Sequence, residues 1–251
     1  MATFVLVHGA WQAGWCWRDV IPRLRVRGHE AIALDLPGHG ADRTPLHAVT
    51  MASYVNAIVA AFGGASERPI LVCHSAAGAA SQAAETASER LAAIVYVAGV
   101  LPANGTALLD IVDGFDPEYL AQFSWAPDRR SAGISPEGAR AYLYPLCPPD
   151  RVEDAIPRMT PEPVGPYEAP LFTTARAASV PAYYVGCLRD RVVSRETQRT
   201  MQERARARRV FEIDCDHSPF FSSPDELVAA LDQVAKEAFG SSRPGRRNGT
   251  D

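Results

Sequence analysis

A serine and a histidine, each close behind an apolar run, could together do nucleophilic chemistry. Ser75 follows the apolar residues 70–73, and an Ala/Gly-rich segment takes over directly after it. This pattern predicts a buried strand that turns sharply into a close-packed helix, with the hydroxyl at the corner. A serine hydroxyl is a weak nucleophile until a base removes its proton, and that base is typically a histidine oriented by a carboxylate. His217 is the only histidine C-terminal to Ser75, so it is the candidate base.

Three aspartates could supply the carboxylate that orients this histidine. Asp190 lies just after the apolar residues 182–185, whereas Asp214 and Asp216 share the short loop that carries His217. A side chain in the same loop reaches Nδ1 of the imidazole less easily, but these residues alone leave the choice of aspartate open.

Strand and helix patterns alternate along the first hundred residues. Apolar runs predict strands at residues 4–7, 31–34, 70–73 and 92–98. Amphipathic or capped stretches between them predict helices at 17–26 and 51–62 and a helix that follows Ser75. This alternation predicts a doubly wound, mostly parallel α/β sheet, which binds its ligands at the carboxyl ends of its strands. The loop 8–10 and Ser75 both follow strand ends, so we expect them on one rim.

The alternation breaks between residues 101 and 179, a segment rich in proline and aromatic residues. It is too long and too apolar for a surface loop, so we predict a helical cap laid over the active rim, inserted before the last two strands. Alternation then resumes with strands at 182–185 and 210–213 and helices near 195–206 and 224–239. The core would therefore comprise residues 1–100 and 180–239, and the Gly/Ser/Arg-rich residues 240–251 predict a disordered tail.

The bulk properties exclude several classes of partner. A net charge of −4 over 251 residues gives no electrostatic case for binding nucleic acid or an acidic membrane. The N-terminus lacks an export signal, and no apolar run has the length of a membrane span. Five irregularly spaced cysteines predict reduced thiols and no metal site. We therefore expect a cytoplasmic protein without cofactor, metal, nucleic-acid or membrane partner; a homodimer stays open.

Several motifs together resemble one family. They are the segment 5–11 with its His8-Gly9-Ala10, the loop Asp35-Leu36-Pro37-Gly38-His39-Gly40, the His74-Ser75 corner, and Asp216-His217-Ser218-Pro219 after the last strand. The chain resembles the α/β-hydrolases, and among them the methyl-esterase and hydroxynitrile-lyase group, which includes plant salicylate methyl esterases and related bacterial esterases. The resemblance covers the core, whereas the cap is similar to the family only in position and length.

The resemblance implies roles for individual residues. In the family's order of nucleophile, acid and base, Ser75 is followed by Asp190 and then His217. The oxyanion hole would consist of the backbone N–H groups of Ala10 and Ala76. We further expect Trp11, His74 and Trp125 to line the substrate pocket.

The main functional hypothesis is a serine esterase that cleaves a small hydrophobic carboxylic ester through an acyl-enzyme. A lactonase, a thioesterase or a biosynthetic cyclase could use the same residues, and a binding-only member would be expected to lose one of them. The hydroxynitrile lyases of the group resemble a pattern with Thr after the first-loop histidine and Lys after the catalytic histidine, where this chain has Gly9 and Ser218. The elbow itself departs from Gly-x-Ser-x-Gly, because Cys73 and Ala77 replace both glycines.

Overall fold

A six-stranded parallel sheet forms the centre of the computed structural model, which describes residues 1–65, 67–112 and 114–240. The strand order is β2-β1-β3-β4-β8-β9, which confirms the predicted doubly wound sheet. The four inner strands are mainly apolar and buried along most or all of their length, as strands covered on both faces require. The strands are β1 (Thr3–Val7), β2 (Glu30–Ala33), β3 (Ile70–Ala76), β4 (Ala93–Val100), β8 (Ala182–Cys187) and β9 (Arg209–Ile213).

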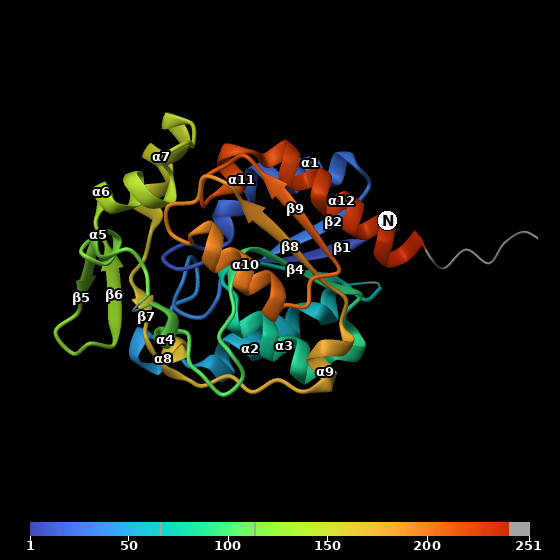
Figure 1. Cartoon of the computed structure of the whole chain (residues 1–251), viewed down its shortest axis with the longest axis horizontal. Helices are drawn as coiled ribbons and strands as arrows, with labels where there is room; N and C mark the ends of the chain where they lie inside the picture. The colour runs from blue at the N-terminus through green and yellow to red at the C-terminus, as the bar shows by residue number, and fades with distance from the viewer. Residues whose placement is uncertain (66, 113, 241–251) are drawn as a thin grey trace, which may run out of the picture.

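Helices cover both faces of the sheet (Figure 1). The helices α1 (Val20–Val26) and α12 (Pro224–Gly240) pack together on one face. The other face carries α2 (Met51–Ala61), α3 (Gly78–Ala87) and α10 (Arg195–Arg204). The first of the predicted helices, at 17–26, instead splits into the 3-10 turn η1 (Gly14–Asp19) and α1.

The cap is only partly helical, which corrects the expectation of a helical cap. Three of its segments form a small antiparallel sheet in the order β5-β6-β7. These strands have two to four residues, too short for the alternation that identifies a strand in a sequence. They are β5 (Phe123–Trp125), β6 (Ser131–Ile134) and β7 (Glu162–Pro163). The cap helices are α4 (Leu109–Val112), α5 (Pro117–Leu120), α6 (Pro136–Gly138), the π-turn η5 (Ala139–Leu143), α7 (Pro149–Ala155), η6 (Ile156–Arg158) and α8 (Gly165–Glu168).

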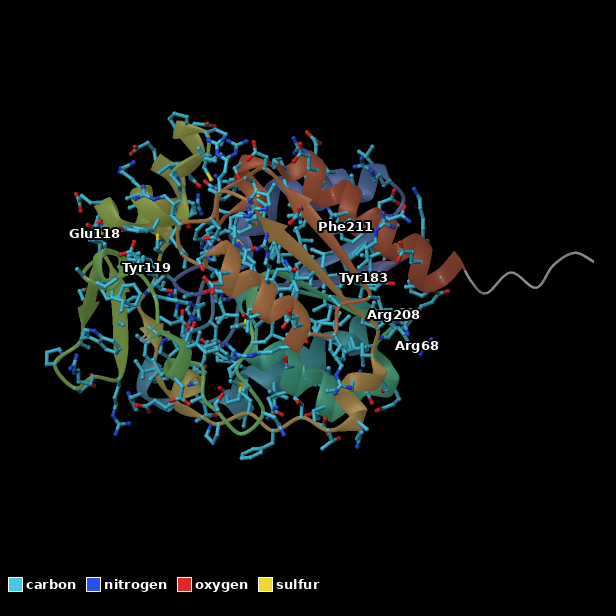
Figure 2. The ribbon with its side chains drawn as sticks, viewed as in Figure 1. Arg68, Glu118, Tyr119, Tyr183, Arg208 and Phe211 are labelled. Atoms are coloured by element: carbon cyan, nitrogen blue, oxygen red, sulfur yellow. The ribbon has the colours of Figure 1, made fainter. Side chains whose placement is uncertain are left out.

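The cap lies beyond the carboxyl ends of the strands. Figure 2 shows Tyr119 of the cap at the opposite side of the molecule from Tyr183 and Arg208, which lie near the starts of β8 and β9. The helix α9 (Ala175–Ser179) falls within the range predicted as cap but packs against α3 of the core. The predicted insertion therefore ends alongside the core instead of over the rim.

At the C-terminal end, Gly240 closes α12, although its composition places it in the predicted tail. The rest of the predicted tail, residues 241–251, lies outside the described residues. Among the described helices, none combines the length and the apolar character that crossing a bilayer requires.

Candidate active site

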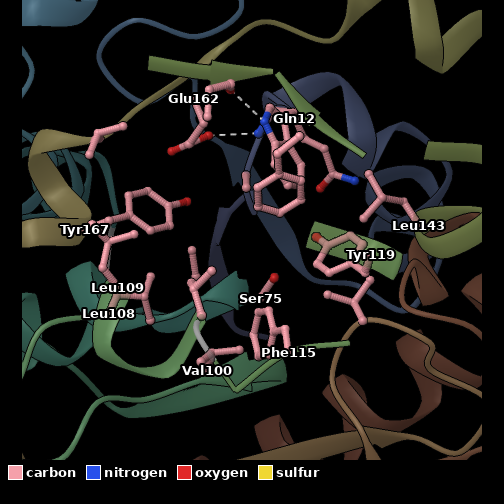
Figure 3. A pocket seen from close by; sticks show the side chains of 18 of the residues that line it. Gln12, Ser75, Val100, Leu108, Leu109, Phe115, Tyr119, Leu143, Glu162 and Tyr167 are labelled. Carbon is pink, nitrogen blue, oxygen red and sulfur yellow. Dashed lines mark hydrogen bonds between the residues drawn. The ribbon is translucent and has the colours of Figure 1, made fainter. Parts of the chain in front are cut away.

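Ser75 lies near the end of β3, at the strained corner that leads into α3. Its φ of +55° is in the left-handed region, which a non-glycine residue adopts at a cost on the order of 1–3 kcal/mol and mostly at functional sites. The pairing of β3 with β4 shifts register between His74 and Ala76. The serine hydroxyl consequently points into a cavity (Figure 3).

The two residues that replace the elbow glycines are both completely buried. Neither Cys73 nor Ala77 has any exposed surface, so a larger side chain at either position would need space that the strand–helix crossing does not have. Burial raises the pKa of the Cys73 thiol to about 12, so this cysteine is a small neutral core residue beside the serine.

The structure brings the serine, the histidine and one aspartate into a hydrogen-bonded chain. His217 Nε2 lies 3.0 Å from Ser75 Oγ, and His217 Nδ1 lies 2.8 Å from Asp190 Oδ2. The histidine and aspartate side chains are 2% and 0% exposed. The other carboxylate oxygen, Oδ1, accepts the backbone N–H groups of Val192 and Val193 at 2.7 and 2.9 Å. An imidazole held in this way can accept the hydroxyl proton and later return it.

The two competing aspartates have other partners. Asp214 is exposed and lies 3.7 Å from Arg189. Asp216 is buried, and it accepts hydrogen bonds from the N–H groups of Leu146 and Ser218 at 2.8 and 3.0 Å. The described contacts of His217 Nδ1 thus select Asp190 among the three candidates.

Two further buried histidines support the corner and the first loop. His74 Nε2 donates to the carbonyl oxygen of His217 at 2.7 Å. Burial and the neighbouring His217 hold the pKa of His74 well below its usual range. His8 Nε2 accepts the N–H of Leu36 at 3.1 Å. Burial, with a contribution from His39, lowers the pKa of His8 to about 4, so both rings are neutral at pH 7.

The two expected oxyanion donors lie beside the serine. Ala10 and Ala76 both line the cavity that contains Ser75. The Ala10 N–H donates to no other group in the part of the chain that the structure describes. Ala10 is followed by Trp11, which like Ser75 has a left-handed backbone, with a φ of +62°.

The cavity is small and mostly apolar. Its volume is about 80 Å³, and Figure 3 shows the serine hydroxyl facing a ring of aliphatic and aromatic side chains. All three predicted pocket residues line it, and Trp125 does so from the cap, where it is 41% exposed. The labelled lining residues include Val100, Leu108, Leu109, Phe115, Tyr119 and Leu143.

The cavity is also lined by three polar residues that no motif of the sequence indicates, Gln12, Glu162 and Tyr167. Glu162 is a carboxylate only 6% exposed within the aromatic cap. It is one of eleven acidic residues between positions 101 and 179, so the sequence alone does not single it out. No cluster of three or more potential metal-ligating side chains occurs among the residues with described positions.

Comparison with known proteins places this geometry in a family. The profile of the Alpha/beta hydrolase family matches residues 4–230. The chain is 34% identical to Methylesterase 7 of Arabidopsis thaliana, covering 92% of this chain and 95% of that protein. It is 30% identical to Methyl jasmonate esterase 1 of Vitis vinifera, covering 93% and 96%.

A solved structure agrees with these relatives. The novel pyrethroid hydrolase from Sphingobium faniae JZ-2 superposes with a TM-score of 0.84 at 26% identity, and the match covers 96% of this chain and 99% of that one. With its sheet order, its elbow at Ser75 and the family match over nearly the whole core, the chain belongs to the alpha/beta hydrolase family and is similar within it to the methylesterases.

Proposed function

We propose that the protein is a serine esterase in which Ser75 is the nucleophile, His217 the base and Asp190 the orienting acid. The observation that carries this proposal is the hydrogen-bonded chain from Ser75 Oγ through His217 to Asp190, which opens into an apolar cavity. The names of the relatives, which include methylesterases and a methyl jasmonate esterase, support ester hydrolysis.

In the first half-reaction, Ser75 Oγ attacks the ester carbonyl carbon while its proton passes to His217 Nε2. The N–H groups of Ala10 and Ala76 donate to the oxyanion, and a donor of this kind is typically worth about 3 kcal/mol of barrier. The tetrahedral adduct then breaks its bond to the alkoxy oxygen, which leaves as the alcohol with the proton from His217. The acyl group stays on Ser75.

In the second half-reaction, water attacks the acyl carbon and gives a proton to His217. The bond to Ser75 Oγ breaks, that oxygen takes the proton back, and the carboxylic acid leaves. Asp190 keeps the imidazole in the tautomer with its proton on Nδ1 and stabilises the imidazolium of each step.

The cavity supports a hydrophobic substrate. Its mainly apolar lining fits hydrocarbon groups better than polar ones, and the methylesterase names of the relatives favour a small alcohol group on the ester. We therefore assign methyl or short-alkyl esters of hydrophobic acids as the substrate class. Lactones and thioesters, or a cyclisation, would use the same residues.

The surroundings of Gly9 support hydrolysis over cyanohydrin cleavage. A Cβ atom at this position would lie 2.7 Å from His74 Nδ1 and 2.9 Å from Ser75 Cβ, so the threonine of the lyase pattern has no space here. Ser218, at the position of the lyase lysine, is completely buried. Release of cyanide from mandelonitrile at enzyme-like rates would contradict this choice.

Covalent labelling tests the proposal most directly. A fluorophosphonate should add to Ser75, as seen by peptide mass spectrometry, and Ser75→Ala should lower the hydrolysis of p-nitrophenyl acetate by at least about 10⁴-fold. A panel of methyl, longer alkyl, aryl and lactone esters should give the highest kcat/KM for the methyl and short-alkyl members. No adduct, together with full activity of Ser75→Ala, would refute covalent catalysis.

A further inference from the structure

The loop that carries the proposed oxyanion donor Ala10 is held in its shape by the cap. Trp11, the next residue, has a left-handed backbone, a conformation that costs a non-glycine residue roughly 1–3 kcal/mol unless the surroundings impose it. The orientation of the peptide group between Ala10 and Trp11 therefore depends on contacts with other parts of the chain.

Three cap residues make hydrogen bonds to different polar groups of Trp11. The Glu162 carboxylate accepts its backbone N–H at 2.8 Å, and the Ala132 carbonyl oxygen accepts its indole N–H at 2.9 Å. The Thr160 N–H donates to its carbonyl oxygen at 3.0 Å. The bond to Glu162 is drawn as a dashed line in Figure 3. The indole of this one residue is thus held by β6, and its backbone is held by β7 and the segment just before it.

The carboxylate of Glu162 is committed to donors from the core. Its Oε1 accepts the Tyr54 hydroxyl at 3.2 Å, and its Oε2 lies 3.4 Å from His39 Nε2. His39 Nε2 in turn lies 2.9 Å from the Tyr54 hydroxyl. Burial alone would raise the pKa of Glu162, but the charge of His39 and the hydrogen bonds lower it overall. With three donors around an almost fully buried carboxylate, Glu162 is better placed to hold the protein's own groups than to bind substrate.

We propose that Glu162 is a positioning residue that holds the loop 9–11 in the shape that presents the Ala10 N–H to the oxyanion, so that docking of the cap completes the active site. This inference rests on the proposed esterase function. A positioning residue differs from a plain structural anchor in one respect. Its loss weakens the stabilisation of the transition state at every active site that is still folded.

The test compares Glu162→Leu, which removes the acceptor of the Trp11 N–H, with Glu162→Gln, which keeps an oxygen that can accept it. Active sites are counted by end-point labelling with a fluorophosphonate, so that kcat refers to competent Ser75 only. We expect Glu162→Leu to lower kcat by about 10²-fold with KM changed less than about threefold. A trifluoromethyl ketone, which forms a tetrahedral adduct with the serine, should bind more weakly in the same proportion, and Glu162→Gln should recover most of both losses.

Glu85→Leu is the matched control. The Glu85 carboxylate likewise accepts backbone N–H groups of a surface segment, from Thr174 at 2.7 Å and Ala177 at 3.2 Å, but it does not line the active-site cavity. This variant can lose stability, and its kcat per labelled site should match that of the unaltered enzyme.

Unchanged kcat and unchanged ketone affinity in Glu162→Leu, even with a lower Tm, would overturn the proposal and leave Glu162 as an anchor only. If Glu162→Leu does not fold, Tyr54→Phe and Glu162→Gln decide the matter, because both must then lower kcat and ketone affinity in parallel by a few-fold. An unaltered enzyme that neither reacts with the fluorophosphonate nor hydrolyses esters would instead refute the proposed function itself.

Discussion

Two buried aspartates lie close to His217, and their hydrogen-bond donors give them different roles. Asp190 presents one oxygen to the imidazole and the other to two backbone N–H groups. Asp216, adjacent in the chain, instead binds the N–H of Leu146 and the hydroxyl of Ser222. Closeness in sequence is therefore a poor guide to which carboxylate contacts His217 Nδ1.

Asp190→Asn should leave the fold intact and lower kcat by about 10⁴-fold, because an amide favours the wrong imidazole tautomer. Steady-state hydrolysis of p-nitrophenyl acetate measures this effect. Asp214→Asn is the control, since its exposed carboxylate lies only near Arg189. A comparable loss in the control with little loss in Asp190→Asn would reassign the acid.

Gly9→Ala should disturb the corner, because the added Cβ would lie 2.7 Å from His74 Nδ1 and 2.9 Å from Ser75 Cβ. Overpacking of this kind typically costs about 1–3 kcal/mol of stability, and here it also displaces the serine. We expect a lower Tm and a clear fall in kcat. At Gly63 the nearest atom to an added Cβ is Arg90 Nη2 at 3.9 Å, so Gly63→Ala should change neither; equal effects at both positions would contradict the steric argument.

At the level of elements, the loop between β9 and α11 (Pro219–Ser222) joins the core to the cap through Asp216. This carboxylate accepts the N–H of Leu146 in the cap. It also accepts the hydroxyl of Ser222, a residue of α11, with an O–O distance of 2.7 Å. A second connection is the ion pair of Arg151 in α7 with Asp19 in η1, at 2.6 Å. The cap is thus attached both at the loop that carries His217 and at the first helical segment.

Asp216→Ala should lower the free energy of unfolding by about 3 kcal/mol, because it leaves buried N–H donors without an acceptor. Urea unfolding at pH 7 measures the change. Asp19→Ala removes a partly exposed ion pair and should cost at most about 1 kcal/mol. If both variants lost the same stability, the buried carboxylate would not be the main attachment of the cap.

At the scale of the whole molecule, several buried imidazoles link stability to pH. Burial lowers the pKa of His8 to about 4 and holds that of His74 well below its usual range. The unfolded chain therefore binds more protons than the folded one below about pH 6.5. His39 has the opposite sign: burial alone would lower its pKa, but the charge and hydrogen bond of Glu162 raise it overall.

The free energy of unfolding should therefore fall as the pH drops from about 6.5 toward 4, and His8 alone accounts for roughly 3 kcal/mol of that fall. His39 opposes this trend only in part, since its stabilisation is complete below about pH 6.5 and is lost as the pH rises through its folded pKa. Urea unfolding at several values between pH 7.5 and 4.5 checks the slope. Constant stability across this range would show that these rings titrate freely in the folded protein.

The sequence predicted the core of this protein because the relevant signals are local. Continuous apolar runs identify the buried parallel strands, and the abrupt change from an apolar run to small residues marks the corner at Ser75. The position of the cap follows from the interruption of the alternation. Its small sheet was missed because strands of two to four residues carry no period.

Only the tertiary structure decided which polar groups meet. The sequence by itself determined an α/β core, a serine corner and a single histidine on its C-terminal side. That Asp190 reaches this histidine, and that Glu162 of the cap binds the N–H of Trp11 from 151 residues away, depends on how distant segments dock. The physical reason is that apolar periodicity depends only on residues that are neighbours in the chain. The donors that hydrogen-bond to a buried carboxylate come from elements that only folding brings together.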